Sequence, residues 1–264
     1  MLEMIYKLII LVIVIVCCII LSFIILHFIK KYKRRIAISE KKYKITNETI
    51  FYYDKTLRRI EALKDFSTVK KGDKGGYIET EDNLSQEGNC WVYENAKVLD
   101  LARVYENAII KGQATIYGSA EVGGNAVVTD NAKIYGRAKV YNHATIYDNA
   151  IIHGYSKVYD KAIVRYNANV RDNANVHDSV DVHDAVICGD ADISSMEDYI
   201  VFRNWWSSGR NFTWTRSNNM WSVGCFYGTG EELITKAYND SKLSGQEYER
   251  VVKYVESILN DNKH

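Results

Sequence analysis

The chain has 264 residues, and its 34 basic and 33 acidic side chains leave a formal net charge of +1 at pH 7. A chain this close to neutral has no strong electrostatic attraction to nucleic acid, so no nucleic-acid partner is expected. Hydrophobic residues make up 47% of the chain and proline is absent, which argues against a disordered or proline-rich linker protein. The cysteines show no metal-ligand spacing, which favours free thiols in a reducing compartment.

Residues 8–29 form an apolar run interrupted only by Ser22 and His27. A helix of this length would measure roughly 33 Å, enough to cross a hydrocarbon core of about 30 Å. The run exceeds the apolar core of a signal peptide and continues directly into KKYKRR at 30–35, so it is predicted to be a membrane anchor. Because the basic flank follows the span, the positive-inside rule predicts a single-pass protein of the cell membrane whose remaining chain lies in the cytoplasm.

A repeat of six residues dominates the middle of the chain. From Cys90 onward a small residue, usually alanine, returns at every sixth position, and Ile or Val follows two positions later, as in AKIYGRAKVYNHATIYDNA at 132–150. Residues two apart on a strand face the same side, and the Asp, Asn or Gly that follows tolerates the positive φ of a turn. Eighteen units with one five-residue slip at 180–184 predict a strand and a turn per unit. Three units would then close one coil, which gives about six coils around a narrow prism.

These units resemble the hexapeptide repeats of the left-handed parallel β-helix, the fold of many bacterial acyltransferases. The left hand is implied by the resemblance and not by the period. The flanking stretches 70–96 and 221–234 resemble those of uncharacterised bacterial and prophage hexapeptide-repeat proteins, which implies a shared architecture but supplies no established activity. The expected fold class is therefore mainly β: a left-handed parallel β-helix with an N-terminal transmembrane helix, a small N-terminal β cap and a C-terminal α+β module.

Both ends of such a β-helix expose unpaired backbone groups and need covers. Before the repeats, LRRIEAL and GGYIET predict two strands joined by the turn KKGDKGG. After them, three antiparallel strands are expected at 199–204, 211–217 and 220–226, followed by two helices with capping boxes at Thr229/Glu232 and Ser244/Glu247. The predicted organisation is an anchor with its basic flank (1–35), a partly helical or irregular spacer (36–56), an N-terminal cap (57–89), the β-helix (90–196) and the C-terminal module (197–264).

Residues 18 positions apart should lie above one another on the same face of the prism. One outward column is largely apolar, and an exposed apolar stripe usually marks a contact surface. Two covers are possible: the C-terminal helices of the same chain, which we favour, or neighbouring prisms in a homotrimer; an unknown protein partner could bind the same face. The column, here called the apolar stripe, consists of Trp91, Ile109, Val127, Thr145 and Ile163.

The repeats contain four histidines, which are the candidate general bases: His143, His153, His177 and His183. Each occupies a turn or a position that tyrosine fills in other units; His143 takes the corner slot of Asn107 and Asn125. No loop interrupts the coils, whereas the acyltransferases that the repeats resemble usually fold such a loop over acyl-CoA. No two of these histidines are 18 apart, and the local cluster of His177, His183, Asp178 and Asp184 falls on successive faces, so no metal is expected within one chain. A metal that bridges a trimer interface stays open, and no other cofactor is expected.

Three functions remain open at this stage. The favoured interpretation is a membrane-tethered β-solenoid that acts as a scaffold or binding protein without catalysis. The first alternative is a hexapeptide-repeat acyltransferase that uses acyl-CoA. The second is a self-assembling structural protein, since prisms can stack end to end where caps fail.

Overall fold

The computed structural model describes Ser22 and residues 41–261. Apart from Ser22, the predicted membrane anchor at 8–29 lies outside the described residues, as does its basic flank. Within the described part of the chain, no helix is both long enough and apolar enough to cross a membrane. The anchor therefore stays a prediction.

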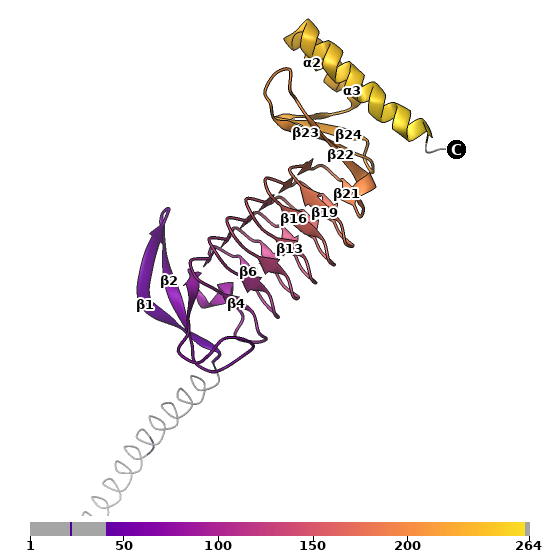
Figure 1. The fold of residues 1–264 in the computed structure, drawn as a ribbon. Coiled ribbons are helices and arrows are strands. Elements are labelled where there is room, and N and C mark those ends of the chain that lie inside the picture. Colours follow the sequence, from indigo (N-terminus) through magenta and orange to yellow (C-terminus); the bar gives the residue numbers. More distant parts are fainter. Residues whose placement is uncertain (1–21, 23–40, 262–264) are drawn as a thin grey trace, which may run out of the picture.

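The repeat region folds into a parallel β-solenoid, the ribbed central body in Figure 1. Its strands, almost all of two residues, distribute in turn over three sheets, so that strands β4–β21 build six coils. This confirms the predicted number of coils. The strands are β4 (Trp91–Val92), β5 (Lys97–Val98), β6 (Arg103–Val104), β7 (Ile109–Ile110), β8 (Thr115–Ile116), β9 (Glu121–Val122), β10 (Val127–Val128), β11 (Lys133–Ile134), β12 (Lys139–Val140), β13 (Thr145–Ile146), β14 (Ile151–Ile152), β15 (Lys157–Val158), β16 (Ile163–Arg165), β17 (Asn169–Val170), β18 (Asn175–Val176), β19 (Asp181–His183), β20 (Val186–Ile187) and β21 (Asp192–Ile193).

The register of the coils follows the period of the sequence. Val127 pairs with Thr145, 18 residues later, whereas Asn169 pairs with Val186. The second interval is one residue shorter because the five-residue unit at 180–184 lies inside it. The slip thus closes one coil with a shorter corner and does not interrupt the stack.

The interior of the prism contains the small residue and the Ile or Val of each unit. In the coil at 132–150, Ala132, Ile134, Ala138 and Val140 are completely buried. Where serine replaces alanine at 156, its hydroxyl donates to the carbonyl oxygens of His153 at 2.8 Å and Val170 at 3.3 Å. The core therefore stays satisfied where it carries a polar atom.

The corners of this coil require left-handed backbone. Gly136, Asn142 and Asp148 have φ values of 72°, 58° and 57°, and glycine, asparagine and aspartate are the residues that tolerate this region best. These are the corner positions that the repeat predicts. Each turn can thus close within a unit of six residues.

The N-terminal cap begins earlier than predicted. Strand β1 (Tyr43–Tyr52) pairs antiparallel with β2 (Lys55–Ala62), which pairs with β3 (Lys74–Ile78), and a short 3-10 helix, η1 (Glu81–Asn83), follows. The prediction of a partly helical or irregular spacer at 36–56 is therefore wrong for β1. Most side chains of β1 are exposed or half-buried on both faces, so the strand lacks the alternation that would reveal it.

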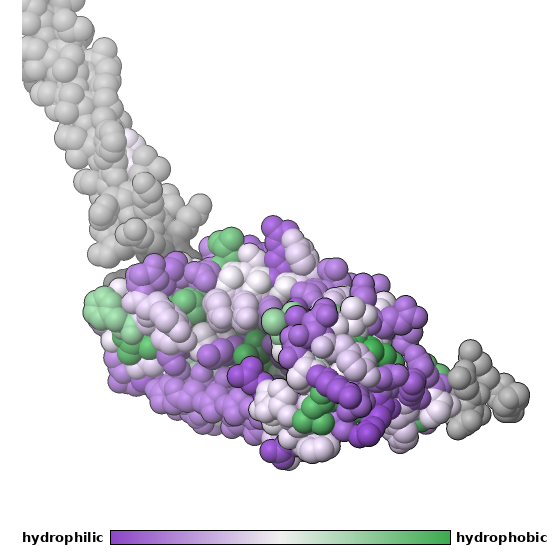
Figure 2. All heavy atoms as spheres, turned by 90° about the horizontal axis from the view of Figure 1, so that it is seen from above, coloured by the Kyte–Doolittle hydropathy of each residue, from purple (hydrophilic) through white to green (hydrophobic). Residues whose placement is uncertain are grey.

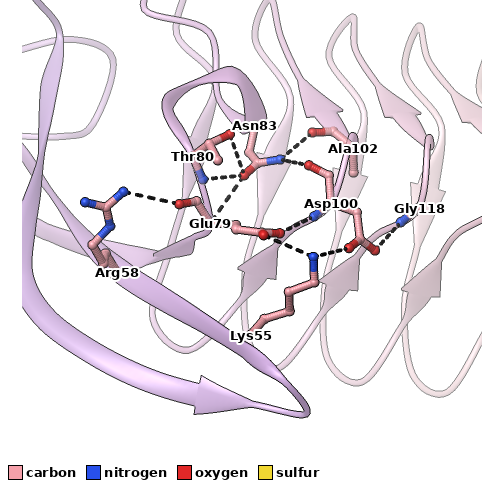
Figure 3. Close-up of polar contacts among 8 residues, drawn as sticks. All are labelled: Lys55, Arg58, Glu79, Thr80, Asn83, Asp100, Ala102 and Gly118. Carbon is pink, nitrogen blue, oxygen red and sulfur yellow. Dashed lines mark hydrogen bonds and ion pairs between the residues drawn. The ribbon is translucent and has the colours of Figure 1, made fainter.

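Polar contacts join this cap to the first complete coils (Figure 3). The Lys55 ammonium lies 3.1 Å from a carboxylate oxygen of Glu79 and 3.1 Å from one of Asp100. The Asn83 amide nitrogen donates to the carbonyl oxygens of Asp100 at 3.0 Å and Ala102 at 2.9 Å. Strand β3 and the bridge of Leu84 to Val104 continue two sheets into the cap.

Lys42 closes the end of the prism below the first coil. Its side chain is almost completely buried, and its ammonium donates to the carbonyl oxygens of Cys90 at 3.0 Å and Glu87 at 3.2 Å. Burial lowers the pKa of this ammonium. Backbone carbonyl groups at this end of the solenoid are thus bonded to a side chain and not to a further strand.

The C-terminal module has four strands where three are predicted. They form one antiparallel sheet, followed by two helices that pack on each other, of which α2 also packs on β24 and β25. The capping box of Thr229 and Glu232 is confirmed, but the second helix begins before the predicted box at Ser244, whose amide donates to the Ser241 hydroxyl at 3.1 Å. The elements are β22 (Tyr199–Arg203), β23 (Asn211–Thr215), β24 (Met220–Val223), β25 (Phe226–Gly228), α2 (Gly230–Asp240) and α3 (Lys242–Asp261), with a 3-10 helix η2 (Met196–Asp198) before them.

This module covers the last coil through side chains. The Thr213 hydroxyl accepts from the amide of Val186 at 2.9 Å, and the Ser217 hydroxyl accepts from the amide of Asp192 at 2.8 Å. Edge groups that could pair with another prism are therefore already bonded. Covered ends disfavour a structural protein that grows by stacking coil on coil.

Candidate functional site

The four candidate histidines do not form one site. His143 and His183 lie in surface ladders: the His143 Nε2 is 3.2 Å from the side-chain nitrogen of Asn125, and the His183 ring meets Tyr166 edge-on at 6.1 Å. Asn125 in turn accepts from Asn107 at 3.2 Å. His143 thus continues a ladder of asparagines, as its corner slot predicts.

His153 lies on a corner of the nine-stranded sheet, at the end of an aromatic ladder. Tyr117 stacks on Tyr135 with ring centroids 4.7 Å apart, and Tyr135 stacks on His153 at 4.8 Å. Burial, and then the positive charge of Arg171 in the next coil, lower the pKa of His153 below its usual 6.5. The imidazole is therefore neutral at pH 7, the state that can accept a proton.

His177 is held between carboxylates. It stacks on Tyr159 with centroids 5.1 Å apart, and its Nδ1 and Nε2 lie 3.1 Å from Asp178 and 3.2 Å from Asp192. Both ring nitrogens are thus engaged within the chain, which makes this histidine a poor free base.

Sequence reasoning missed the cluster around this histidine. Ligand atoms of Asp160, His177 and Asp178 lie within 4.8 Å of one another, a geometry that could hold a divalent ion. Asp160 and Asp178 are 18 positions apart, and both occupy corners with φ near 60°. That spacing was the signal: the sequence shows Asp178 beside His177, but Asp160 is found only when aspartates 18 positions apart are compared as well.

The apolar stripe forms a continuous column, as its register predicts, but its first member is not exposed. The pairings Trp91–Ile109, Ile109–Val127 and Thr145–Ile163 stack it along one six-stranded sheet. Trp91 is only 1% exposed because the rings of Tyr43 and Phe66 pack against it. The other members are half-buried.

The predicted cover of the stripe by the C-terminal helices is wrong. These helices pack on the C-terminal sheet and share a separate core with it, formed around Phe212, Trp214 and Trp221. Their apolar faces are already used there. A homotrimer or a partner protein on the stripe stays a prediction. Figure 2 shows the molecule from above, where hydrophobic side chains form small groups among hydrophilic ones.

Three cavities lie away from these histidines. One of about 640 Å³, between η1 and the solenoid, is lined by polar side chains that include Glu81, Arg103 and Glu121. Another of about 260 Å³ lies under the β1–β2 hairpin, and a third of about 350 Å³ lies in the C-terminal module. None of the four histidines lines any of these three cavities.

The fold and these surfaces define a capped parallel β-solenoid of six coils. No protein-family model matches the chain. Over 38 residues the chain is 53% identical to a protein of Escherichia coli (strain K12) described as the uncharacterized acetyltransferase YdcK. The match covers 14% of this chain and 12% of that protein, so it relates a short segment and not the two whole proteins.

Proposed function

We propose that the chain is a hexapeptide-repeat acyltransferase with a left-handed β-helix, which transfers an acyl group from acyl-CoA. The observation that carries the proposal is the local identity to a protein described as an acetyltransferase, combined with a neutral histidine at a corner of the solenoid. The repeat architecture agrees with this class. The sequence-based preference for a non-catalytic scaffold becomes the second candidate.

His153 is the best of the four candidate bases. Its pKa is lowered by burial and by Arg171, so it is unprotonated at pH 7, whereas both nitrogens of His177 face carboxylates. Arg171, the next residue along this corner, supplies a cation of the kind that binds CoA phosphates.

The proposed step needs one base and no resident cofactor. His153 accepts the proton of an acceptor hydroxyl or amine as that group attacks the thioester carbonyl carbon. The carbon–sulfur bond then breaks, and the CoA thiolate leaves and takes the proton from the imidazolium. The second wall of the site would come from a neighbouring prism in a trimer, which agrees with the absence of His153 from the cavities described above.

Titration of acetyl-CoA into the purified full-length protein, followed by calorimetry, tests the proposal. Binding should be measurable, the protein should be a trimer by light scattering, and His153→Gln should abolish hydrolysis or transfer of the acetyl group. His143→Gln is the matched control, because it changes a histidine of the same solenoid that already contacts Asn125. A monomer that does not bind acetyl-CoA would refute acyl transfer.

A scaffold without catalysis is the second candidate. It is favoured by the coils themselves, because strands β4–β21 follow one another without an inserted loop that could cover CoA. A scaffold would bind a partner through the apolar stripe, and Val127→Asp in the middle of the stripe would then abolish capture of that partner.

We further propose that residues 8–29 anchor the protein as a single-pass span, with the solenoid in the cytoplasm. The support is the length of the apolar run and the basic flank that follows it. Protease treatment of sealed cells against broken cells tests this. The solenoid should be cut only after the membrane is opened, and cutting in sealed cells would reverse the topology.

A further inference from the structure

The cavity in the C-terminal module has an incompletely bonded polar floor. Asn204 and Tyr248 line it and are only 5% and 6% exposed. The Asn204 side-chain nitrogen donates to the Tyr248 hydroxyl at 2.7 Å, but the Asn204 Oδ1 is buried and has no hydrogen-bond partner. Rotating the amide by 180° would only exchange the unpaired atom, leaving its nitrogen without an acceptor. Such unpaired buried groups are rare in native proteins and call for an explanation.

The mouth of the same cavity carries three charges. Arg210, Lys236 and Asp240 line it and are exposed. In residues 41–261 none of these three side chains has an ion pair or a side-chain hydrogen bond. Half-buried or buried apolar groups of Val223, Phe226 and Leu233 form the walls between mouth and floor. The lining of the cavity thus combines a residue with a buried unpaired acceptor, apolar side chains, and two exposed cations with one exposed anion.

We infer that this cavity binds a small acidic amino acid. A ligand with two carboxylates and one ammonium complements the two cations and one carboxylate at the mouth. An N–H of the ligand would satisfy the Asn204 Oδ1, and its methylene groups would contact the apolar walls. The volume of about 350 Å³ lies at the lower end of ordinary ligand pockets, which suits a molecule of this size.

This site is independent of the proposed acyl transfer. Its lining residues all belong to the C-terminal module and include neither His153 nor Arg171. Failure of acetyl-CoA binding would therefore leave this inference intact, and the reverse also holds.

Calorimetry of the full-length protein with L-glutamate and L-aspartate tests the inference, with L-glutamine as the neutral probe. At least one acidic amino acid should bind, and L-glutamine should bind about tenfold more weakly because it lacks the second carboxylate. Arg210→Glu and Lys236→Glu should each weaken binding by about tenfold or more. Lys242→Glu, an exposed lysine just beyond α2 that does not line the cavity, is the matched control and should leave binding unchanged.

Three results would overturn the inference. They are no heat from either acidic amino acid at millimolar concentration, equal binding of L-glutamine, and binding that survives both charge reversals. Because the reversed residues are exposed, their variants should fold normally, which an unchanged thermal transition would verify. Asn204→Leu provides a further readout: it should weaken glutamate binding while leaving the thermal transition where it is.

Discussion

The solenoid and the C-terminal module satisfy their polar groups in different ways. In the solenoid each coil bonds to the next at a constant register, and the buried hydroxyl of Ser156 finds carbonyl acceptors. In the module a few large aromatic rings form the core, and the Asn204 Oδ1 and the Trp206 Nε1 are buried without partners. In the described residues the solenoid has one such buried atom, the Asn169 Oδ1 in β17, whereas the smaller module has three, because the Ser222 hydroxyl is also unpaired. A ligand that binds by satisfying unpaired buried groups is therefore expected mainly in the module.

The two regions also differ in how tightly they are packed, and the largest expected effect tests this difference. Ala138 lies inside the prism, where every neighbouring coil repeats the same narrow interior. Ala237 is equally buried in α2 but lines the cavity of about 350 Å³. Ala138→Leu should lower the free energy of unfolding by about 3 kcal/mol, because hydrogen bonds between the coils leave no room for the added carbons. Ala237→Leu should lower it by under about 1 kcal/mol, because the cavity can accept them.

Urea unfolding of the two variants, followed by far-ultraviolet circular dichroism, measures this difference. Lys139→Ala, next to Ala138 on the outer face, is the control and should change the free energy of unfolding little. Equal losses in the two alanine variants would mean that the module is packed as tightly as the prism.

A smaller effect should separate two buried asparagines. Asn83 uses its whole side chain, since it accepts from the amide of Thr80 at 2.8 Å and donates to Asp100 and Ala102. The Asn204 side chain makes one hydrogen bond, from its nitrogen to the Tyr248 hydroxyl. Asn83→Leu should therefore lower the free energy of unfolding by about 2 kcal/mol by leaving carbonyl and amide groups unpaired, whereas Asn204→Leu should lower it by under about 1 kcal/mol, because the lost bond to the Tyr248 hydroxyl is partly offset by removal of an unpaired oxygen.

Thermal unfolding of both variants against the parent protein decides this prediction. The midpoint should fall clearly for Asn83→Leu and stay close to the parent for Asn204→Leu. A large fall for Asn204→Leu would mean that its oxygen is well bonded, for example to an ordered water, and would weaken the case for a ligand at that floor.

The contrast between the two regions also explains what the sequence could predict. Every coil repeats one pattern, so a wrong assignment of strands or corners would have shown as a break in it. This pattern predicts the period of six, the slip at 180–184 and the corners at Gly136, Asn142 and Asp148. Strand β1 was missed because a hairpin exposed on both faces has no apolar alternation. The start of α3 was missed because Ser241 and Ser244 are both suitable N-cap residues, and the hydroxyl of Ser241 is the one that accepts a hydrogen bond from the first turn.

The candidate sites depend on contacts that no local pattern records. The stacking of Asp160 on Asp178 beside His177 could be found from the 18-residue spacing, once acids are considered with histidines. The unpaired oxygen of Asn204 could not be found from the sequence. The orientation of this side chain is set by a hydrogen bond from its nitrogen to the hydroxyl of Tyr248, which lies 44 residues away on α3. In the repeats, side chains that stack can be found from their spacing, whereas a site in the irregular module depends on contacts between residues that no period relates.

The smallest expected effect concerns pH and should appear in the solenoid alone, because residues 199–261 contain no histidine. The pKa of His153 in the folded protein lies below the 6.5 of an ordinary histidine. Between these two values the unfolded chain binds more protons than the folded one, so the free energy of unfolding rises with pH through this window and falls as the solution is acidified. The contribution is fully present above 6.5 and is lost below the folded pKa.

Urea titrations of the parent protein and His153→Gln between about pH 7.5 and about pH 5.5 should therefore converge on acidification, with a difference of under about 1 kcal/mol. A His153→Gln protein that keeps the pH dependence of the parent would show that Arg171 and burial do not hold this imidazole neutral.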